Sequence, residues 1–179
     1  MATATGDTGT EPVIISRYYS VDNPPQPRLA VVVVTYETRD LLRDFLLSVR
    51  AEQARMAGMP VKVVVVDNAS TDGTAEMVRR EFPDVRLIAS AENGGPARAF
   101  NLGLAEVIPE ADLVVISNSD VTIHAGTLGK MVEFLRKHPD VDGCCGRLYN
   151  SDGTPQVTRT RIWSWRRTPK DQPHRATFP

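Results

Sequence analysis

The chain contains the run Val61-Lys62-Val63-Val64-Val65-Val66-Asp67-Asn68, in which five valines stand close together before two polar residues. A strand that is apolar on both faces belongs inside a parallel sheet covered by helices on each side. The abrupt change to Asp67 and Asn68 marks the end of such a strand. The run therefore predicts a buried strand whose polar groups begin at its carboxyl end.

Similar runs occur on either side of this one. Leu29 to Val34 precedes it, Val85 to Ala89 and Leu113 to Ser117 follow it, and a further strand is expected near Val141 to Tyr149. Strands that alternate with helical patterns indicate an α/β fold, with a mainly parallel sheet and helices on both faces. One domain of this class accounts for a chain of 179 residues.

Four segments between the strands have apolar residues at helical spacing. Asp72 or Ser70 is expected to cap the second helix. The apolar positions are Leu41, Leu42, Phe45, Leu46 and Val49 in the first, Ala75, Val78 and Phe82 in the second, Ala97, Phe100 and Leu104 in the third, and Leu128, Met131, Val132 and Leu135 in the fourth.

The ends of the chain differ from its middle. Residues 1–27 are expected to be a flexible leader, residues 28–158 the folded domain, and residues 159–179 a basic, proline-containing tail with little stable structure. Trp163 and Trp165 in this tail fit either contact with a sugar or membrane surface or a place in a core. Peripheral membrane contact and self-association both stay open.

Composition excludes several classes of function. A formal net charge of −1 provides no global field for nucleic acid or an anionic membrane. The adjacent Cys144 and Cys145 are expected to be reduced thiols. Met1 to Thr10 lacks the basic and apolar parts of a secretory signal, and no apolar run approaches the ~20 residues that span a bilayer. We therefore expect a cytoplasmic protein without a transmembrane segment.

Polar groups follow each of the four clearest strand-like runs. The carboxyl ends of parallel strands meet at one edge of a sheet, where ligands of such folds bind. We expect these groups to form one site. They are Thr35-Tyr36-Glu37, Asp67-Asn68-Ala69-Ser70, Asn93-Gly94-Gly95 and Asn118-Ser119-Asp120.

This ordered set resembles the family 2 glycosyltransferases of the GT-A fold, particularly the branch that includes bacterial rhamnosyltransferases. Each stretch is weak alone, and the order makes the set specific. The stretches are residues 31–36, 65–74, 93–103 and 118–121, which together with Asp152-Gly153 cover roughly Leu29 to Gln156.

The resemblance implies a GT-A sheet truncated on its C-terminal side. It implies transfer of a sugar from a UDP-, dTDP- or GDP-sugar to the hydroxyl of a saccharide or lipid-linked acceptor, with inversion. Polysaccharide biosynthesis is the implied process.

The first two groups match the donor-binding loops of that family. Thr35, Tyr36 and Glu37 correspond to the loop that holds base and ribose, although an ordinary turn with Thr38 as helix cap is the alternative. Asp67 corresponds to the carboxylate that accepts the imide N–H of uracil or thymine. Asn68 fits either donor binding or a tight turn.

The third group precedes a helix. The segment Asn93-Gly94-Gly95 can bring backbone amides and the positive helix end close to a phosphate, and Arg98 adds a full charge one turn later. A glycine turn with a solvated arginine is the alternative. The segment is not a GxGxxG fingerprint, which argues against a dehydrogenase.

The fourth group, Asn118-Ser119-Asp120, occupies the place of the family's Asp-x-Asp motif. The resemblance implies that Asp120 holds Mn²⁺ or Mg²⁺, hard cations that prefer oxygen ligands, beside the donor diphosphate. Asn118 is neutral where many relatives are acidic, so its direct ligation stays open. A simple loop and helix entry is the alternative.

No catalytic base is assigned. In the resembling family it comes from a Glu-Asp segment well downstream, and Asp140, Asp142 and Asp152 do not match that segment. We therefore expect an incomplete enzyme that binds a metal-nucleotide complex weakly and transfers sugar slowly or not at all. The rival interpretations are a sugar nucleotidyltransferase, whose glycine-rich basic loop is missing after Val34, and a non-catalytic nucleotide-binding or scaffold module.

Overall fold

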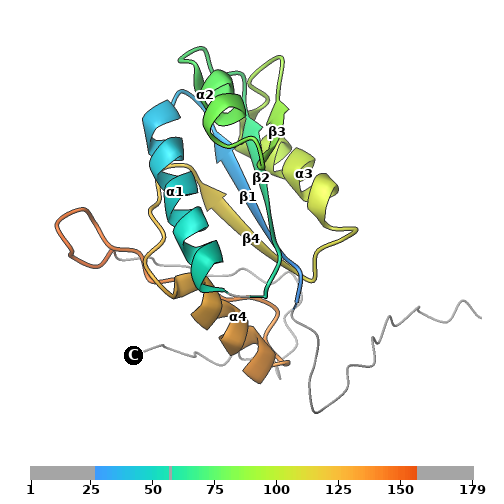
Figure 1. Cartoon of the computed structure of the whole chain (residues 1–179), viewed down its shortest axis with the longest axis vertical. Coiled ribbons are helices and arrows are strands. Elements are labelled where there is room, and N and C mark those ends of the chain that lie inside the picture. The colour runs from blue at the N-terminus through green and yellow to red at the C-terminus, as the bar shows by residue number, and fades with distance from the viewer. Residues whose placement is uncertain (1–26, 57, 157–179) are drawn as a thin grey trace, which may run out of the picture.

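The computed structural model describes residues 27–56 and 58–156. The predictions for residues 1–26 and 157–179, including those for Trp163 and Trp165, lie outside the described residues. Strands and helices alternate along the described chain (Figure 1). The elements are β1 (Leu29–Thr35), α1 (Arg39–Arg55), β2 (Val61–Asp67), α2 (Thr74–Glu81), β3 (Arg86–Ala89), α3 (Gly95–Val107), β4 (Leu113–Asn118) and α4 (Thr127–Lys137).

The four strands form one parallel sheet in the order β3-β2-β1-β4. Each lies within about one residue of the range predicted from the sequence. After β1 the chain moves to β2 and β3 on one side, and β4 then pairs with β1 on the other side. The crevice at such a change of direction, beyond the carboxyl ends of the strands, is where doubly wound sheets bind ligands.

Helices cover both faces of the sheet, as the valine runs predicted. α1 and α2 pack on the face that carries Val31 and Val65. α3 packs on the opposite face, against Val32 and Val64. α4 instead lies at the amino ends of the strands, where Leu128 contacts the cluster around Leu29 (Figure 1). The described helices include none with the length and hydrophobicity needed to cross a bilayer.

The strand predicted at Val141 to Tyr149 is wrong. The described structure has no strand there, only an isolated antiparallel bridge between Tyr149 and Pro155. Glycines at positions 143 and 146 weaken strand structure, and the bridge closes a local turn instead of adding to the sheet. Cys144 is half-buried and Cys145 exposed, so neither is packed in a strand, and both are free thiols.

Two residues that were predicted to lie on the apolar faces of helices are exposed instead. Leu41 on α1 and Ala97 on α3 are exposed. The stripe of α1 begins at Leu42 and continues to Glu52, whose side chain is buried. That of α3 is a row of small and medium residues, Ala99, Gly103 and Val107, which lets the helix approach the sheet closely. The other predicted positions of α1 are buried, whereas on α3 the predicted Phe100 and Leu104 are only partly buried beside the row that faces the sheet.

Gly103 should be intolerant of even one added methyl group. A Cβ there would overlap the Val32 side chain and lie 3.1 Å from Cγ2 of Val66. We expect Gly103→Ala to destabilise the fold by about 1–3 kcal/mol, the usual range for overpacking. The measurement is the midpoint of urea unfolding.

The matched control is Gly129→Ala in α4, where an added Cβ would meet nothing within 4 Å. Alanine is the better helix former there, so this variant should gain about 0.5–1 kcal/mol. Equal midpoints for the two variants would contradict the close packing of α3 on β1 and β2.

Candidate functional site

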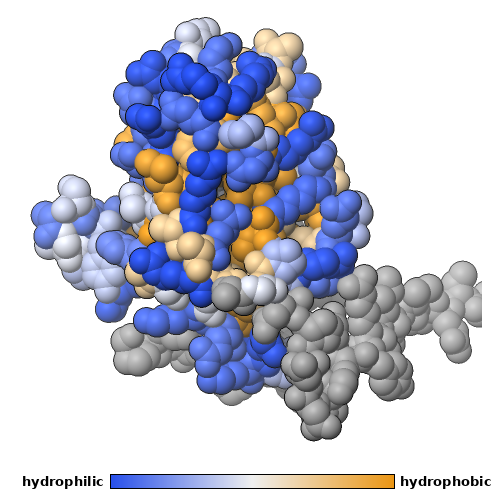
Figure 2. All heavy atoms as spheres, viewed as in Figure 1, coloured by the Kyte–Doolittle hydropathy of each residue, from blue (hydrophilic) through white to orange (hydrophobic). Residues whose placement is uncertain are grey.

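The polar groups predicted from the strand ends meet at one edge of the sheet. Thr35 pairs directly with Asp67 across β1 and β2, and Val34 pairs with Asn118 across β1 and β4. Neighbouring strands lie about 4.8 Å apart, so these ends are immediate neighbours. Asp67 and Asp120 therefore lie at the same edge of the molecule. We call this edge, formed by the loops that follow β1, β2, β3 and β4, the rim. Figure 2 shows hydrophilic residues gathered at this end, around α2.

Glu37 links the loop after β1 to the loop after β2. Its Oε1 accepts hydrogen bonds from the amide of Thr71 at 2.8 Å and the hydroxyl of Thr71 at 3.1 Å. Its own amide donates to Oγ of Ser70 at 2.9 Å. The backbone at Glu37 has φ 53°, a left-handed conformation that is uncommon outside glycine. Glu37 thus holds the two loops together, a role that the sequence did not reveal.

The side chain of the neighbouring residue, Tyr36, does not connect the loops. The residue is 49% exposed, and its side chain makes no hydrogen bond within the described residues. An exposed aromatic ring at the ligand end of a sheet offers a flat apolar surface for a planar partner. Thr35, by contrast, is buried under the loop.

Asp67 is the buried carboxylate of the rim, with 2% of the residue exposed. Its Oδ1 accepts the amide of Ser70 at 3.0 Å, across a tight turn in which Ala69 has φ 69°. Its backbone carbonyl accepts the amide of Ser90 at 2.8 Å. No described residue donates a hydrogen bond to Oδ2, so one oxygen remains for a ligand.

Asn68 braces the second loop against the third. Its Nδ2 donates to Oδ1 of Asn93 at 2.7 Å, and its Oδ1 accepts the amide of Gly94 at 3.2 Å. Oδ1 of Asn93 also accepts the amide of Gly95 at 3.0 Å. The Gly94 and Gly95 amides, which we expected to point at phosphate, are therefore engaged by side chains. The structure favours a loop-bracing role for both asparagines.

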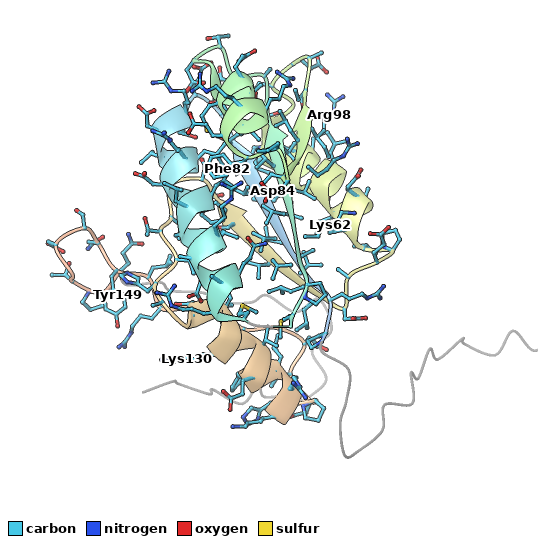
Figure 3. All side chains as sticks on the ribbon, viewed as in Figure 1. Lys62, Phe82, Asp84, Arg98, Lys130 and Tyr149 are labelled. Atoms are coloured by element: carbon cyan, nitrogen blue, oxygen red, sulfur yellow. The ribbon has the colours of Figure 1, made fainter. Side chains whose placement is uncertain are left out.

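Arg98 lies beside this loop at the start of α3 (Figure 3). Its side chain passes so close to Gly94 that a Cβ there would be 2.5 Å from Cδ of Arg98. It pairs with Glu92 at 2.6 Å, and both side chains are largely exposed. Such a surface pair contributes only about 0–1 kcal/mol, so a phosphate can compete for the guanidinium.

The fourth group combines one fixed residue with two exposed ones. Ser119 is 5% exposed, and its Oγ lies 2.7 Å from Oγ1 of Thr38. Thr38 in turn contacts Oγ1 of Thr35 at 2.8 Å. Thr38 stands at the N-cap position of α1, but its hydroxyl makes no capping bond. The hydroxyl joins the loop after β1 to the loop after β4 instead.

Asp120 follows immediately and is exposed. Its carboxylate has no hydrogen bond or ion pair with any described residue. Within residues 27–56 and 58–156, no three His, Cys, Asp or Glu side chains come together to form a metal site. A single uncommitted carboxylate fits a cation that takes most of its ligands from phosphate and water. Asn118, also exposed, lies two residues earlier.

A separate shallow pocket at the other end of the strands contains none of these residues. Its position beside α4, where Figure 3 labels Lys130, separates it from the rim. It is lined by Met59, Gly129, Val132, Glu133, Arg136 and Lys137.

A family model described as "Glycosyl transferase family 2" matches residues 30–178. The chain belongs to glycosyltransferase family 2. The resemblance found in the four loop motifs is thereby confirmed.

Curated relatives of this family 2 chain include a rhamnosyltransferase and a succinoglycan biosynthesis protein. The N-acetylglucosaminyl-diphospho-decaprenol L-rhamnosyltransferase of Mycobacterium tuberculosis is 30% identical over 135 residues, 70% of this chain and 43% of the relative. The succinoglycan biosynthesis protein ExoO of Rhizobium meliloti is 35% identical over 116 residues, 62% of this chain and 32% of the relative. The chain thus spans less than half the length of either relative.

Solved structures of glycosyltransferases share its fold. A mannosyltransferase of Pyrobaculum calidifontis, in complex with GDP-Man and Mn²⁺, has a TM-score of 0.54 and 33% identity over 67% of this chain and 36% of its own. Staphylococcus aureus TarS in complex with UDP has a TM-score of 0.54 and 27% identity over 63% of this chain and 33% of its own. The predicted GT-A fold is confirmed.

Asp72 is a rim residue whose full role the sequence did not indicate. The N-cap position of α2 is occupied by Gly73 and not by the predicted Asp72 or Ser70, but Oδ1 of Asp72 accepts the amide of Thr74 at 3.1 Å and the hydroxyl of Thr74 at 2.5 Å from one position earlier. Its Oδ2 accepts the amide of Arg39 at 2.9 Å, at the start of α1. One carboxylate therefore satisfies the first turns of two helices in this family 2 domain.

These contacts change the acidity of Asp72. Burial raises the pKa of the carboxyl, but hydrogen bonds from Thr74 and Arg39 and the charge of Arg39 outweigh burial, so the pKa is lowered below its ordinary value. A lowered folded-state pKa stabilises the protein above the unfolded-state pKa, about 3.9. That contribution is lost as the pH falls through the folded-state pKa.

Asp72→Asn should therefore lower stability at pH 7 by about 1–3 kcal/mol, because the amide nitrogen that replaces one oxygen cannot accept a hydrogen bond and leaves a backbone amide at the start of one helix without its acceptor. It should also flatten the fall in unfolding free energy below about pH 4. Urea unfolding at pH 7 and at several acidic values measures both effects. As a control, Asp44→Asn on the exposed side of α1 should change stability at pH 7 by less than about 0.5 kcal/mol. Parallel acid curves for wild type and Asp72→Asn would contradict this role.

Proposed function

We propose that this chain binds the nucleoside diphosphate part of a sugar donor at the rim and so forms the donor half of a family 2 glycosyltransferase. Family membership supports sugar transfer as the reaction class. The donor loops lie together at the carboxyl edge of the sheet, beside the switch between β1 and β4. The acceptor is a saccharide or lipid-linked hydroxyl, attacked with inversion, and the setting is cytoplasmic.

The observation that carries this proposal is the uncommitted carboxylate of Asp120. Glu37, Asp67 and Asp72 each have at least one carboxylate oxygen engaged in a hydrogen bond that holds a loop. Asp120 is exposed and keeps both oxygens for a ligand. A divalent cation held there would neutralise the charge that develops on the departing diphosphate. Arg98 adds a positive charge at the neighbouring loop.

Recognition of the base follows from Tyr36 and Asp67. The exposed ring of Tyr36 offers a surface on which a base can lie. The remaining oxygen of Asp67 can accept the imide N–H of a uracil or thymine. A buried acceptor rejects a base that lacks the matching donor, because the acceptor would be left unpaired.

The cation assignment predicts a binding pattern. Calorimetric titration of the 179-residue chain with UDP-, dTDP- and GDP-sugars should give tighter binding with Mn²⁺ than without it for at least one donor. Asp120→Ala should abolish this gain while leaving metal-free binding within about twofold, because the residue contacts only the cation. This comparison isolates Asp120 from the rest of the rim.

Asp140→Ala is the control, since Asp140 is an exposed carboxylate just beyond α4 that makes no contact with the rim. It should keep the full manganese-dependent gain. If Asp120→Ala keeps the gain as well, Asp120 does not hold the cation. If no nucleotide binds under any condition, a scaffold module is the better interpretation.

The base assignment predicts a change in selectivity. Wild-type protein should prefer UDP over CDP, since cytosine lacks the imide N–H. Asp67→Asn should reduce that preference by about tenfold or more, a loss typical of an unpaired buried polar group. The ratio of the two dissociation constants is the measurement, and it cancels general effects on the loop. A ratio unchanged by the substitution would rule out this role of Asp67.

A further inference from the structure

The segment after β4, residues 119–126, descends beside α1 from the rim to the start of α4 (Figure 1). It contains Asp120 and has no helix or strand of its own. Such a segment usually moves freely unless other elements hold it. The side-chain hydrogen bonds that hold this one come from α1 and its cap.

Three polar side chains along α1 bind the segment in order. Thr38 at the N-cap contacts Ser119 at 2.7 Å, as described above. Ser48, in the middle of the helix, accepts the amide of Ile123 at 3.1 Å while its own hydroxyl donates to the carbonyl of Phe45. The contacts follow α1 from its start toward its end, in the same direction in which the segment runs from the rim to α4.

Glu52 fixes the lower end. Only 1% of this residue is exposed, and its Oε1 and Oε2 accept the amides of Gly126 at 2.7 Å and Leu128 at 3.0 Å. Those amides belong to the first turn of α4, where a carboxylate is favoured by the helix dipole. The nearby guanidinium of Arg55 lies 3.9 Å from Oε1. A buried carboxylate at this position thus has specific partners.

Apolar contacts complete the attachment on the C-terminal side of Asp120. Val121 and Ile123 pack against the core cluster beneath α1. Asp120 therefore stands between a buried, hydrogen-bonded Ser119 and a packed Val121. Its backbone is fixed on both sides while its carboxylate projects into solvent.

We infer that α1 is the positioning element for the cation ligand, and that Thr38, Ser48 and Glu52 are positioning residues that keep Asp120 at the rim before any donor binds. This inference rests on the proposed function of Asp120. A ligand carboxylate that is already in place loses less conformational freedom on binding, so affinity for the metal-nucleotide complex is higher. None of the three residues touches the donor itself.

The first test replaces the Thr38 hydroxyl without changing the shape of the side chain. Thr38→Val should reduce the manganese-dependent gain in nucleotide affinity by about three- to tenfold, the range expected for one or two hydrogen bonds. Metal-free affinity should stay within about twofold. Thr38→Ser keeps the hydroxyl and should keep the gain. Thr127→Val makes the same chemical change on α4, where the threonine hydroxyl has no hydrogen bond in the described structure, and should also keep it.

Asp120→Ala, measured in parallel, separates the positioning role of Thr38 from the assignment of Asp120 as the cation ligand. Loss of the gain in Asp120→Ala with full retention in Thr38→Val would overturn the positioning role alone. Retention of the gain in Asp120→Ala would overturn the cation assignment on which it rests. Equal losses of metal-free and metal-dependent binding in Thr38→Val would show a merely structural role and also overturn the inference.

A second test needs no ligand. Amide hydrogen exchange should become at least about tenfold faster at Ile123 in Ser48→Ala, and at Gly126 and Leu128 in Glu52→Gln, because their acceptors are lost or weakened. The amides of β1 should keep their wild-type rates. Unchanged exchange at Ile123, Gly126 and Leu128 would show that α1 does not hold the segment.

Discussion

The in-register parallel pairing of β1 with both β2 and β4 is the constraint on which the site depends. Because Thr35 is level with Asp67 and Val34 is level with Asn118, three loops start within two strand spacings of one another. A shift of one residue would turn the buried valines of β1 toward the wrong helix layer. The same burial that fixes the core therefore fixes the position of the loops.

Most polar side chains at the rim bind other loops. Glu37, Asn68 and Asp72 each connect segments that are far apart in sequence. Through these links the rim behaves as one connected structure. Tyr36, Asn118 and Asp120 are the exceptions, since they are exposed and their side chains have no hydrogen bonds within the described residues. This division separates side chains that build the site from those left available to a ligand.

The sequence predicted the four strands and four helices well, because long valine runs and helical stripes are local signals. It failed where local patterns were weaker than the tertiary contacts. Residues near Cys144 are apolar enough for a strand but pair with none in the described structure. Leu41 continues the apolar pattern of α1 in the sequence, yet it is exposed, and the buried face of the helix begins at Leu42.

The loops also contain contacts that could not be predicted from local sequence patterns. Polar residues at the strand ends were enough to predict that the loops meet at one edge of the sheet. Their partners were not predictable, because Asn68 with Asn93 and Thr38 with Ser119 join positions 25 and 81 residues apart. Glu52 gave no signal at all, since a glutamate in a helix is normally read as a solvent-exposed residue.

Two non-glycine residues in left-handed conformations, Glu37 and Ala69, lie in two loops that the hydrogen bond from the Glu37 amide to Ser70 joins. Such backbone conformations cost on the order of 1–3 kcal/mol each and persist only when the surroundings impose them. The loops are thus held in shape by the sheet below, against their own preference. As temperature rises, these turns should relax before the strands separate. The capacity to bind a donor would then have a lower thermal limit than the fold itself.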